Sequence, residues 1–183
     1  MNNPFLLLFL GVIRTRFILT QTHHPGNVGA SARAIKTMGF DELVLVKPRD
    51  PKVLNRQKTK EGASGAVNVL EGAIVYNSLS EALEGTEIWC GTGMPNDMSI
   101  TRENKRYSEP RPYLQDVVNN KKIESISFVF GNERVGMSKE DMEMCHVVLG
   151  IPTNPSFGSL NLASAVQLIA YDWRQALGGF YSH

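Results

Sequence analysis

Four short runs rich in glycine and small polar residues follow apolar segments of this chain, and they are its best candidates for ligand binding. They are residues 22–29 (THHPGNVG), 91–95 (GTGMP), 131–136 (GNERVG) and 152–161 (PTNPSFGSLN). Glycine lets a backbone approach a ligand closely, and parallel strands gather such loops at the carboxyl edge of a sheet. We therefore expect a pocket for a small flat molecule where these runs meet.

Several well-known chemical motifs are absent from the chain. It contains no G-x-G-x-x-G, no G-x-x-x-x-G-K-[ST] and no H-E-x-x-H, which disfavours a dinucleotide dehydrogenase, a nucleotide triphosphatase and a zinc protease. His23 and His24 are adjacent in a turn, and Cys145 and His146 are adjacent before a strand, so neither pair is placed to act on one atom. We favour solvated turn residues for the first pair over a metal site, and packing for the second pair over a Cys–His nucleophile.

Arg33 is a cation whose direction on a helix can be inferred. On a helix that begins at Val28, the apolar residues Val28, Ala32 and Ile35 share one face, and Arg33 lies about 140° away. Arg33 is therefore expected to face out of the core, near the loop that precedes the helix. Taken alone, this is also the position of an ordinary surface arginine.

Apolar, β-branched segments alternate with helical ones, a pattern that predicts βαβ units and a mainly parallel sheet flanked by helices, in an α/β fold. The expected strands are 16–20, 42–46, 73–76, 87–90, 125–130 and 147–151. The expected helices are 28–38, 63–70, 79–83, 112–119, a short one after residue 138 and a long one over 160–177. The last helix is apolar nearly all round, so we expect a second subunit to cover part of it.

The composition is that of an ordinary globular chain, with 183 residues, 42% of them hydrophobic, and a net charge of +1. Such a charge excludes a polybasic protein that binds nucleic acid through bulk charge. Two cysteines make no disulfide framework, so a reducing, cytoplasmic location is expected. The apolar run 5–13 is about half the roughly 20 residues that span a bilayer. We expect an N-terminal arm without membrane association there, with a short anchor or targeting remnant as the alternative.

The near-zero net charge hides one basic segment. Residues 47–60 contain six basic residues against one acidic residue, a net charge of +5. This segment is either a solvated connection or a phosphate-binding surface. In the second case the RNA-binding residues are Lys47, Arg49, Lys52, Arg56, Lys58 and Lys60. Residues 91–111 hold four further basic residues, and a loop of about twenty residues inside a compact domain is more often functional than not.

Taken in order, three of these segments resemble the motifs of the SPOUT (SpoU/TrmH-type) RNA ribose 2′-O-methyltransferases. The first motif is Asn27-Val28-Gly29-Ala30 with Arg33, the second runs from Phe128 to Gly136, and the third is Ile151-Pro152 with Ser159 to Ala163. The resemblance spans roughly residues 17–173. Residues 24–27, 36–40 and 154–155 are most similar to the TrmJ branch, which methylates ribose 32 of the tRNA anticodon loop.

The resemblance implies one SPOUT domain over residues 16–178, between an arm (1–15) and a tail (179–183). It also implies a deep trefoil knot in the C-terminal part, which general rules of topology nearly exclude, and a homodimer. The methyl donor would be S-adenosylmethionine, the product S-adenosylhomocysteine and the RNA partner tRNA, with no metal. The implied donor pocket comprises Thr92, Gly93, Met94, Gly131, Ile151, Gly158, Ser159 and Leu160.

The catalytic residues that the resemblance implies are Arg33, Ser159 and Asn161, while Asn27 and Glu133 hold the pocket together. Methyl transfer to a 2′-hydroxyl needs the oxygen aligned behind the methyl group and relieved of its proton. Arginine stays protonated, so we expect Arg33 to stabilise negative charge on the oxygen rather than to act as a base. Ser159 and Asn161 would orient the hydroxyl.

Two features depart from the TrmJ branch. Gly93-Met94-Pro95 stands where the branch usually has a Ser-Ala-Arg-like run, so we expect a different pocket rim. The branch usually continues in a C-terminal extension that aids tRNA binding, so we expect tRNA affinity to be weak in this chain. The alternative functions are methylation of another tRNA position or of ribosomal RNA, and, from a different class, a non-catalytic RNA-binding module on the same fold.

Overall fold

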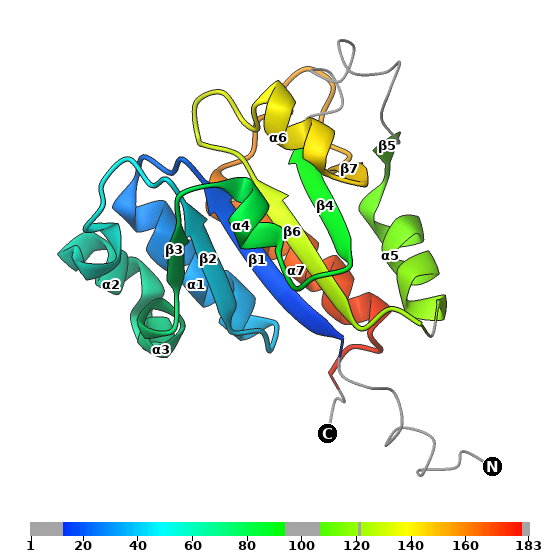
Figure 1. The fold of residues 1–183 in the computed structure, drawn as a ribbon, viewed down its shortest axis with the longest axis horizontal. Helices are drawn as coiled ribbons and strands as arrows, with labels where there is room; N and C mark the ends of the chain where they lie inside the picture. Colours follow the sequence, from blue (N-terminus) through cyan, green and yellow to red (C-terminus); the bar gives the residue numbers. More distant parts are fainter. Residues whose placement is uncertain (1–12, 94–106, 121, 181–183) are drawn as a thin grey trace.

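A parallel sheet forms the centre of the computed structural model, which describes residues 13–93, 107–120 and 122–180. Its seven strands lie in the order β3-β2-β1-β6-β4-β7-β5 (Figure 1), and every pair of neighbouring strands is parallel. The parallel α/β architecture is thus confirmed, with one strand more than the six expected. The strands are β1 (Arg14–Thr20), β2 (Glu42–Val46), β3 (Ile74–Tyr76), β4 (Ile88–Gly93), β5 (Tyr107–Ser108), β6 (Ser125–Phe130) and β7 (Val147–Gly150).

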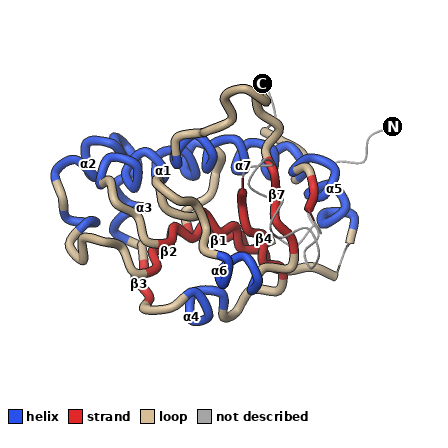
Figure 2. The backbone as a smooth tube through the Cα atoms, turned by 90° about the horizontal axis from the view of Figure 1, so that it is seen from above, coloured by secondary structure: helices blue, strands red, loops and turns tan. Residues whose placement is uncertain are grey.

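Helices cover both faces of the sheet (Figure 2). Five lie on one face: α1 (Pro25–Thr37), α2 (Gln57–Ala63), α3 (Val67–Glu71), α5 (Pro110–Asn119) and α7 (Leu162–Ala176). The other face carries α4 (Leu79–Leu83) and α6 (Lys139–Met144). Successive side chains of a strand point to opposite faces, so Phe17 joins the larger core under the five helices and Ile18 joins the smaller core under α4. None of the described helices is long and apolar enough to cross a bilayer.

Residues 47–60 are more structured than the expected connection. A short 3-10 turn occupies Val53–Asn55, and α2 begins at Gln57. The expected helix over 63–70 is wrong in its bounds. Helix α2 ends before Ser64, whose φ of 50° is left-handed, and the next α-helix is α3. The helix α2 packs against α1 without room for a methyl group, since a Cβ on Gly29 would lie 2.0 Å from the carbonyl oxygen of Thr59.

The helices α1 and α7 run side by side and are joined at both ends. At their beginnings, the Asn161 amide donates a hydrogen bond to Asn27 Oδ1 at 3.0 Å. At their ends, Arg174 Nε donates to the carbonyl of Met38 at 2.8 Å, and its guanidinium lies 4.6 Å from the centre of the Phe40 ring. The helices therefore run in the same direction and hold a fixed register.

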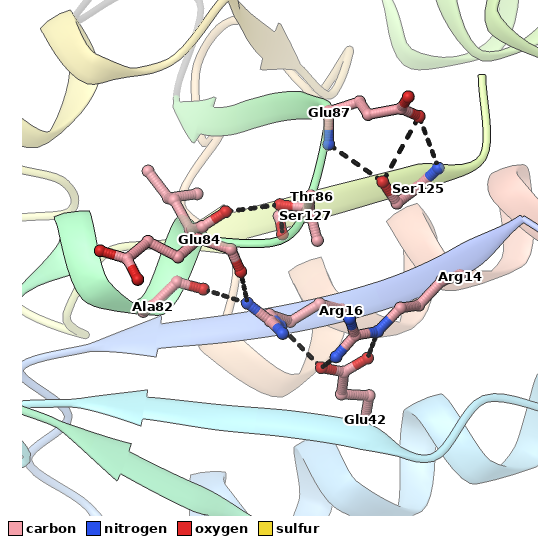
Figure 3. A network of polar contacts seen from close by, with 10 residues as sticks. Arg14, Arg16, Glu42, Ala82, Glu84, Thr86, Glu87, Ser125 and Ser127 are labelled. Carbon is pink, nitrogen blue, oxygen red and sulfur yellow. Dashed lines mark hydrogen bonds and ion pairs between the residues drawn. The ribbon is translucent and has the colours of Figure 1, made fainter. Parts of the chain in front are cut away.

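A partly buried ion-pair network lies at the amino edge of the sheet (Figure 3). The side chain of Arg16 is 5% exposed and contacts Glu42 at 2.7 Å, while Arg14 binds the same carboxylate from outside. Arg16 also donates to the carbonyls of Ala82 and Glu84 at the end of α4. Burial alone would raise the pKa of Glu42, but hydrogen bonds from Arg14 and Arg16 lower it overall. The network fastens α4 to the sheet.

Candidate functional site at the carboxyl edge

A cavity of about 250 Å³ opens where β4, β6 and β7 end. It collects three of the four glycine-containing runs, as expected from the sequence. Of the eight residues predicted to bind the donor, seven line this cavity, and Met94 lies outside the described residues. The seven are Thr92, Gly93, Gly131, Ile151, Gly158, Ser159 and Leu160.

The loop after β6 forms one wall of the cavity and is folded on itself. The backbones of Asn132 and Gly136 exchange two hydrogen bonds of 3.1 and 3.0 Å, and Asn132 Oδ1 accepts from the N–H of Arg134 at 2.9 Å. Gly131 leaves no space for a side chain, because a Cβ there would lie 1.9 Å from the carbonyl carbon of Gly136. Glycine at position 131 is therefore a requirement of this turn.

The inner wall of the cavity is mainly apolar. Thr92 turns its polar atoms toward the protein: its hydroxyl donates to the Val129 carbonyl at 2.9 Å, and its N–H donates to Met137 Sδ at 3.3 Å. Met142 and Leu149 extend the apolar lining. A cavity with thioether and aliphatic walls and backbone groups at its glycine-rich rim fits a flat, uncharged ring such as a purine nucleoside.

Glu133 ties the cavity loop to the start of α1. Its carboxylate accepts hydrogen bonds from the backbone N–H of His23 at 2.9 Å, the N–H of His24 at 3.1 Å and the amide of Asn27 at 3.0 Å. Burial opposes the charged form, but these hydrogen bonds prevail and lower the pKa of Glu133. Asn27 and Glu133, which were predicted to hold the pocket together, are thus hydrogen-bonded to each other.

The three predicted catalytic residues are placed differently. Ser159 lines the cavity. Asn161 caps the N-terminus of α7, where its Oδ1 accepts from the N–H of Ala163 at 2.9 Å, and its amide donates to Asn27. Arg33 faces outward from α1, as its helical position predicts, but it does not line the cavity of its own chain.

Comparison with known proteins decides the family. Residues 14–171 match the SpoU rRNA Methylase family. The chain belongs to this family. It is 40% identical over 161 residues to the tRNA (cytidine/uridine-2'-O-)-methyltransferase TrmJ of Photorhabdus laumondii, which covers 88% of this chain and 64% of that relative. The chain therefore spans less than two thirds of the length of this curated relative.

Solved structures agree with the assignment to the SpoU family. A probable methyltransferase from Bordetella pertussis Tohama I has a TM-score of 0.81 at 38% identity, over 94% of this chain and 98% of that one. TrmJ from Z. mobilis ZM4 has a TM-score of 0.76 at 29% identity, over 92% and 72%. The resemblance drawn from the three motifs is thereby confirmed.

The surroundings of the two adjacent pairs, Cys145–His146 and His23–His24, show what these residues do in this SpoU-family chain. Cys145 is buried, and His146 stacks on Trp89 with ring centres 4.8 Å apart, so packing accounts for the second pair. His24 is exposed, whereas His23 is half-buried, with its ring Nδ1 3.0 Å from the carbonyl of Gln21. The backbone N–H groups of both histidines, which sequence patterns do not single out, are what bind Glu133.

The basic residues of segment 47–60 differ in whether a carboxylate pairs with them. Arg56 is paired with Asp50, to which its Nε and Nη2 both donate. The remaining five basic residues are exposed and have no ion pair with a carboxylate in the described part of the chain. They are Lys47, Arg49, Lys52, Lys58 and Lys60.

Proposed function

We propose that this chain methylates a ribose 2′-hydroxyl of tRNA, at nucleotide 32 of the anticodon loop, with S-adenosylmethionine as donor. The carrying observation is that the second and third family motifs line one cavity while the first is hydrogen-bonded to both through Asn27. The tRNA substrate is supported by the name of the TrmJ relative. Acting on tRNA, the enzyme would work in the cytoplasm.

The cavity suits the adenosyl part of the donor. Gly131, Gly158 and Leu160 would present backbone groups to it, and Ile151 with Met137 would enclose the ring. When bound, S-adenosylmethionine supplies a methyl group made electrophilic by its sulfonium. Thr92 has its N–H and hydroxyl engaged by the protein, which favours an uncharged ligand face there.

The chain's own residues would activate the ribose. Ser159 lines the cavity and is exposed, and it would hydrogen-bond the 2′-hydroxyl. A guanidinium beside the oxygen stabilises the negative charge that develops as its proton leaves, and we assign this to Arg33. Asn161 has both side-chain polar atoms engaged, so it acts by fixing the position of Ser159 and of α1.

Arg33 reaches a cavity most simply in a homodimer. It projects from the outer side of α1, and the adjacent helix α7 exposes Leu168 and Tyr171. Burying these two side chains against a second copy would remove apolar surface from water. We therefore propose a homodimer in which Arg33 of one subunit serves the cavity of the other.

The proposed C-terminal trefoil knot involves the segment that follows β7. This segment borders the same cavity as the loop after β6, and it leads into α7 on the opposite side of the sheet from α6 (Figure 2). Passage of residues 151–161 through the loop after β6 would account for both facts.

A methyl-transfer assay tests the function. The full chain is incubated with methyl-labelled S-adenosylmethionine and an unmodified tRNA transcript, and the label is mapped to a nucleotide. The matched control is the same tRNA with 2′-deoxyribose at nucleotide 32, which has no acceptor oxygen and should take up no label. Label at another ribose would contradict position 32, and absence of label from tRNA and ribosomal RNA would favour the non-catalytic module.

A further inference from the structure

A cation stands directly at the mouth of the cavity. Arg134 lines the cavity and is exposed, while its neighbour Glu133 turns inward to bind the start of α1. The backbone N–H of Arg134 is held by Asn132, so the base of the side chain has a fixed place. Arg134 forms no ion pair with a carboxylate in the described part of the chain, and its charge is therefore available to an external anion.

A second cation borders the same turn from another loop. The backbone N–H of Arg49 donates to the carbonyl of Thr22 at 3.0 Å, which ties the loop after β2 to the loop after β1. The next residue, His23, donates to Glu133. Arg49 and Arg134 thus flank the turn at residues 22–24. Arg49 is exposed and unpaired with any described carboxylate, unlike Arg56 of the same basic segment.

A third cation lies at the end of β2. Lys47 has a left-handed φ of 45°, and Gln21 at the end of the neighbouring strand has a φ of 50°. Such values are uncommon for residues other than glycine. Both backbones remain bonded to the sheet, Gln21 to Val46 and Lys47 to Tyr76. The exposed Lys47 is therefore fixed at the carboxyl edge, next to the loop that carries Arg49.

The helix α6, which lies at the same edge of the sheet, has a net negative charge. Helix α6 exposes Glu140 and Glu143, of which Glu143 contacts Lys139. It also carries Asp141, whose pKa is raised by burial although Lys47 opposes the shift. A polyanion at the cavity is repelled by α6 and attracted by the three cations. This distribution of charge favours a path along the side of the cavity nearest the turn at residues 22–24.

We propose that Arg134, Arg49 and Lys47 form a phosphate track, which binds the RNA backbone next to the target nucleotide. The inference rests on the proposed function, since it takes the cavity as the place where the target ribose enters. It divides the basic segment 47–60, because Lys47 and Arg49 belong to the track while Arg56 is neutralised by Asp50. It also adds Arg134, which lies outside that segment.

Charge reversals test the phosphate track. The variants are Arg134→Glu, Arg49→Glu and Lys47→Glu, and the matched control is Lys122→Glu, an exposed lysine just before β6 at the amino edge. Binding of an unmodified tRNA transcript is measured by filter retention between about 50 and 200 mM salt. Each track variant should raise Kd at least ~5-fold and reduce the salt slope by about one. The control should leave both within about twofold of the parent, as expected when no phosphate contact is lost.

Two further measurements keep the interpretation clear. Arg49→Lys should restore most of the affinity, because it returns the charge without the guanidinium shape. Binding of S-adenosylhomocysteine to Arg49→Glu and Lys47→Glu, followed by calorimetry, should match the parent and so report an intact fold. Unchanged tRNA affinity in the track variants, or an equal loss in the control, overturns the track.

The outcome is separable from that of the proposed function. Filter retention needs no turnover, so a chain that binds tRNA through the track but transfers no methyl group contradicts the function alone. Methyl transfer by the parent together with unaltered tRNA affinity in the variants contradicts the track alone. A parent chain that binds no tRNA at any salt concentration overturns the track as well.

Discussion

The side-chain amide of Asn161 donates a 3.0 Å hydrogen bond to Asn27, a residue 134 positions earlier in the sequence. Asn27 uses its own amide to bind Glu133 at 3.0 Å. The three family motifs are therefore joined in a single polar chain, with one residue from each. This chain sets the position of α1 relative to the cavity loop and to the start of α7.

Substituting the middle member should loosen all three motifs. Asn27→Ala removes a donor to the charged Glu133, and a hydrogen bond to a charged group contributes about 1.5–3 kcal/mol. We expect the free energy of unfolding in urea to fall by about that amount and methyl transfer to fall with it. The control is Asn119→Ala at the exposed end of α5, whose 3.4 Å contact with Gln115 is weak. Equal losses for both variants would contradict the special place of Asn27.

The carboxylate of Glu133 should make stability depend on pH. Its pKa is lowered below the ordinary value of 4.5, so the charged form stabilises the fold above that pH. The contribution is lost as pH falls through the lower, folded pKa. The free energy of unfolding is compared for the parent and for Glu133→Gln between about pH 7 and pH 3, a range that covers the titration of carboxylates.

The parent should be the more stable chain at pH 7, and the difference should shrink below the ordinary pKa of glutamate. Taking the difference between the two chains removes the parallel contribution of Glu42, whose pKa is also lowered. If the difference in free energy of unfolding stayed constant with pH, the charge of Glu133 would not be the source of its contribution to stability.

Gly131→Ala should damage the donor site. The new methyl group would overlap the backbone of Gly136 and Met137, so the cavity loop must move. We expect the Kd for S-adenosylhomocysteine to rise at least ~10-fold, which is about 1.4 kcal/mol. Gly26→Ala is the matched control, because a Cβ there meets nothing within 4 Å. Calorimetry measures both, and unaltered binding by Gly131→Ala would exclude this loop from the donor site.

Arg33→Ala should lower turnover and spare donor binding. Loss of one group that stabilises a developing oxyanion typically costs about 10²–10³ in kcat, and Arg33 is exposed and outside the cavity. The subunit that it serves can be tested by mixing Arg33→Ala with Gly131→Ala. If Arg33 acts across a dimer, randomly mixed subunits recover about a quarter of the parental sites. No recovery, despite exchange of subunits, would place Arg33 at its own cavity.

The sequence predicts the strands best where both faces of the sheet are covered. The strands 42–46 and 125–130 were expected with the bounds observed, because strands that are buried on both faces consist mostly of apolar residues. The strand β5 pairs with β7, but its two residues are too few to show a periodicity in the sequence. The interruption of the expected helix at Ser64 depends on a left-handed backbone conformation. A serine in the sequence does not predict that conformation.

The sequence predicted those residues of the candidate site that belong to the glycine-rich motifs. Seven of the eight pocket residues line one cavity, since glycine-rich loops after parallel strands converge by topology. Met137 was missed. Its thioether accepts a hydrogen bond from the N–H of Thr92, but in the sequence a methionine cannot be distinguished from an ordinary core residue. The helical period predicted that Arg33 faces outward. It could not predict which cavity an outward side chain approaches, because tertiary contacts decide that.

The double junction of α1 with α7 has a consequence for motion. With Asn27 bound to Asn161 at one end and Met38 bound to Arg174 at the other, neither helix can separate from the sheet alone. The two should open as one cooperative unit, and their slowest amide protons should exchange with solvent at a common free energy. The helix that carries Arg33 and the helix that closes the cavity would then share every fluctuation large enough to expose them.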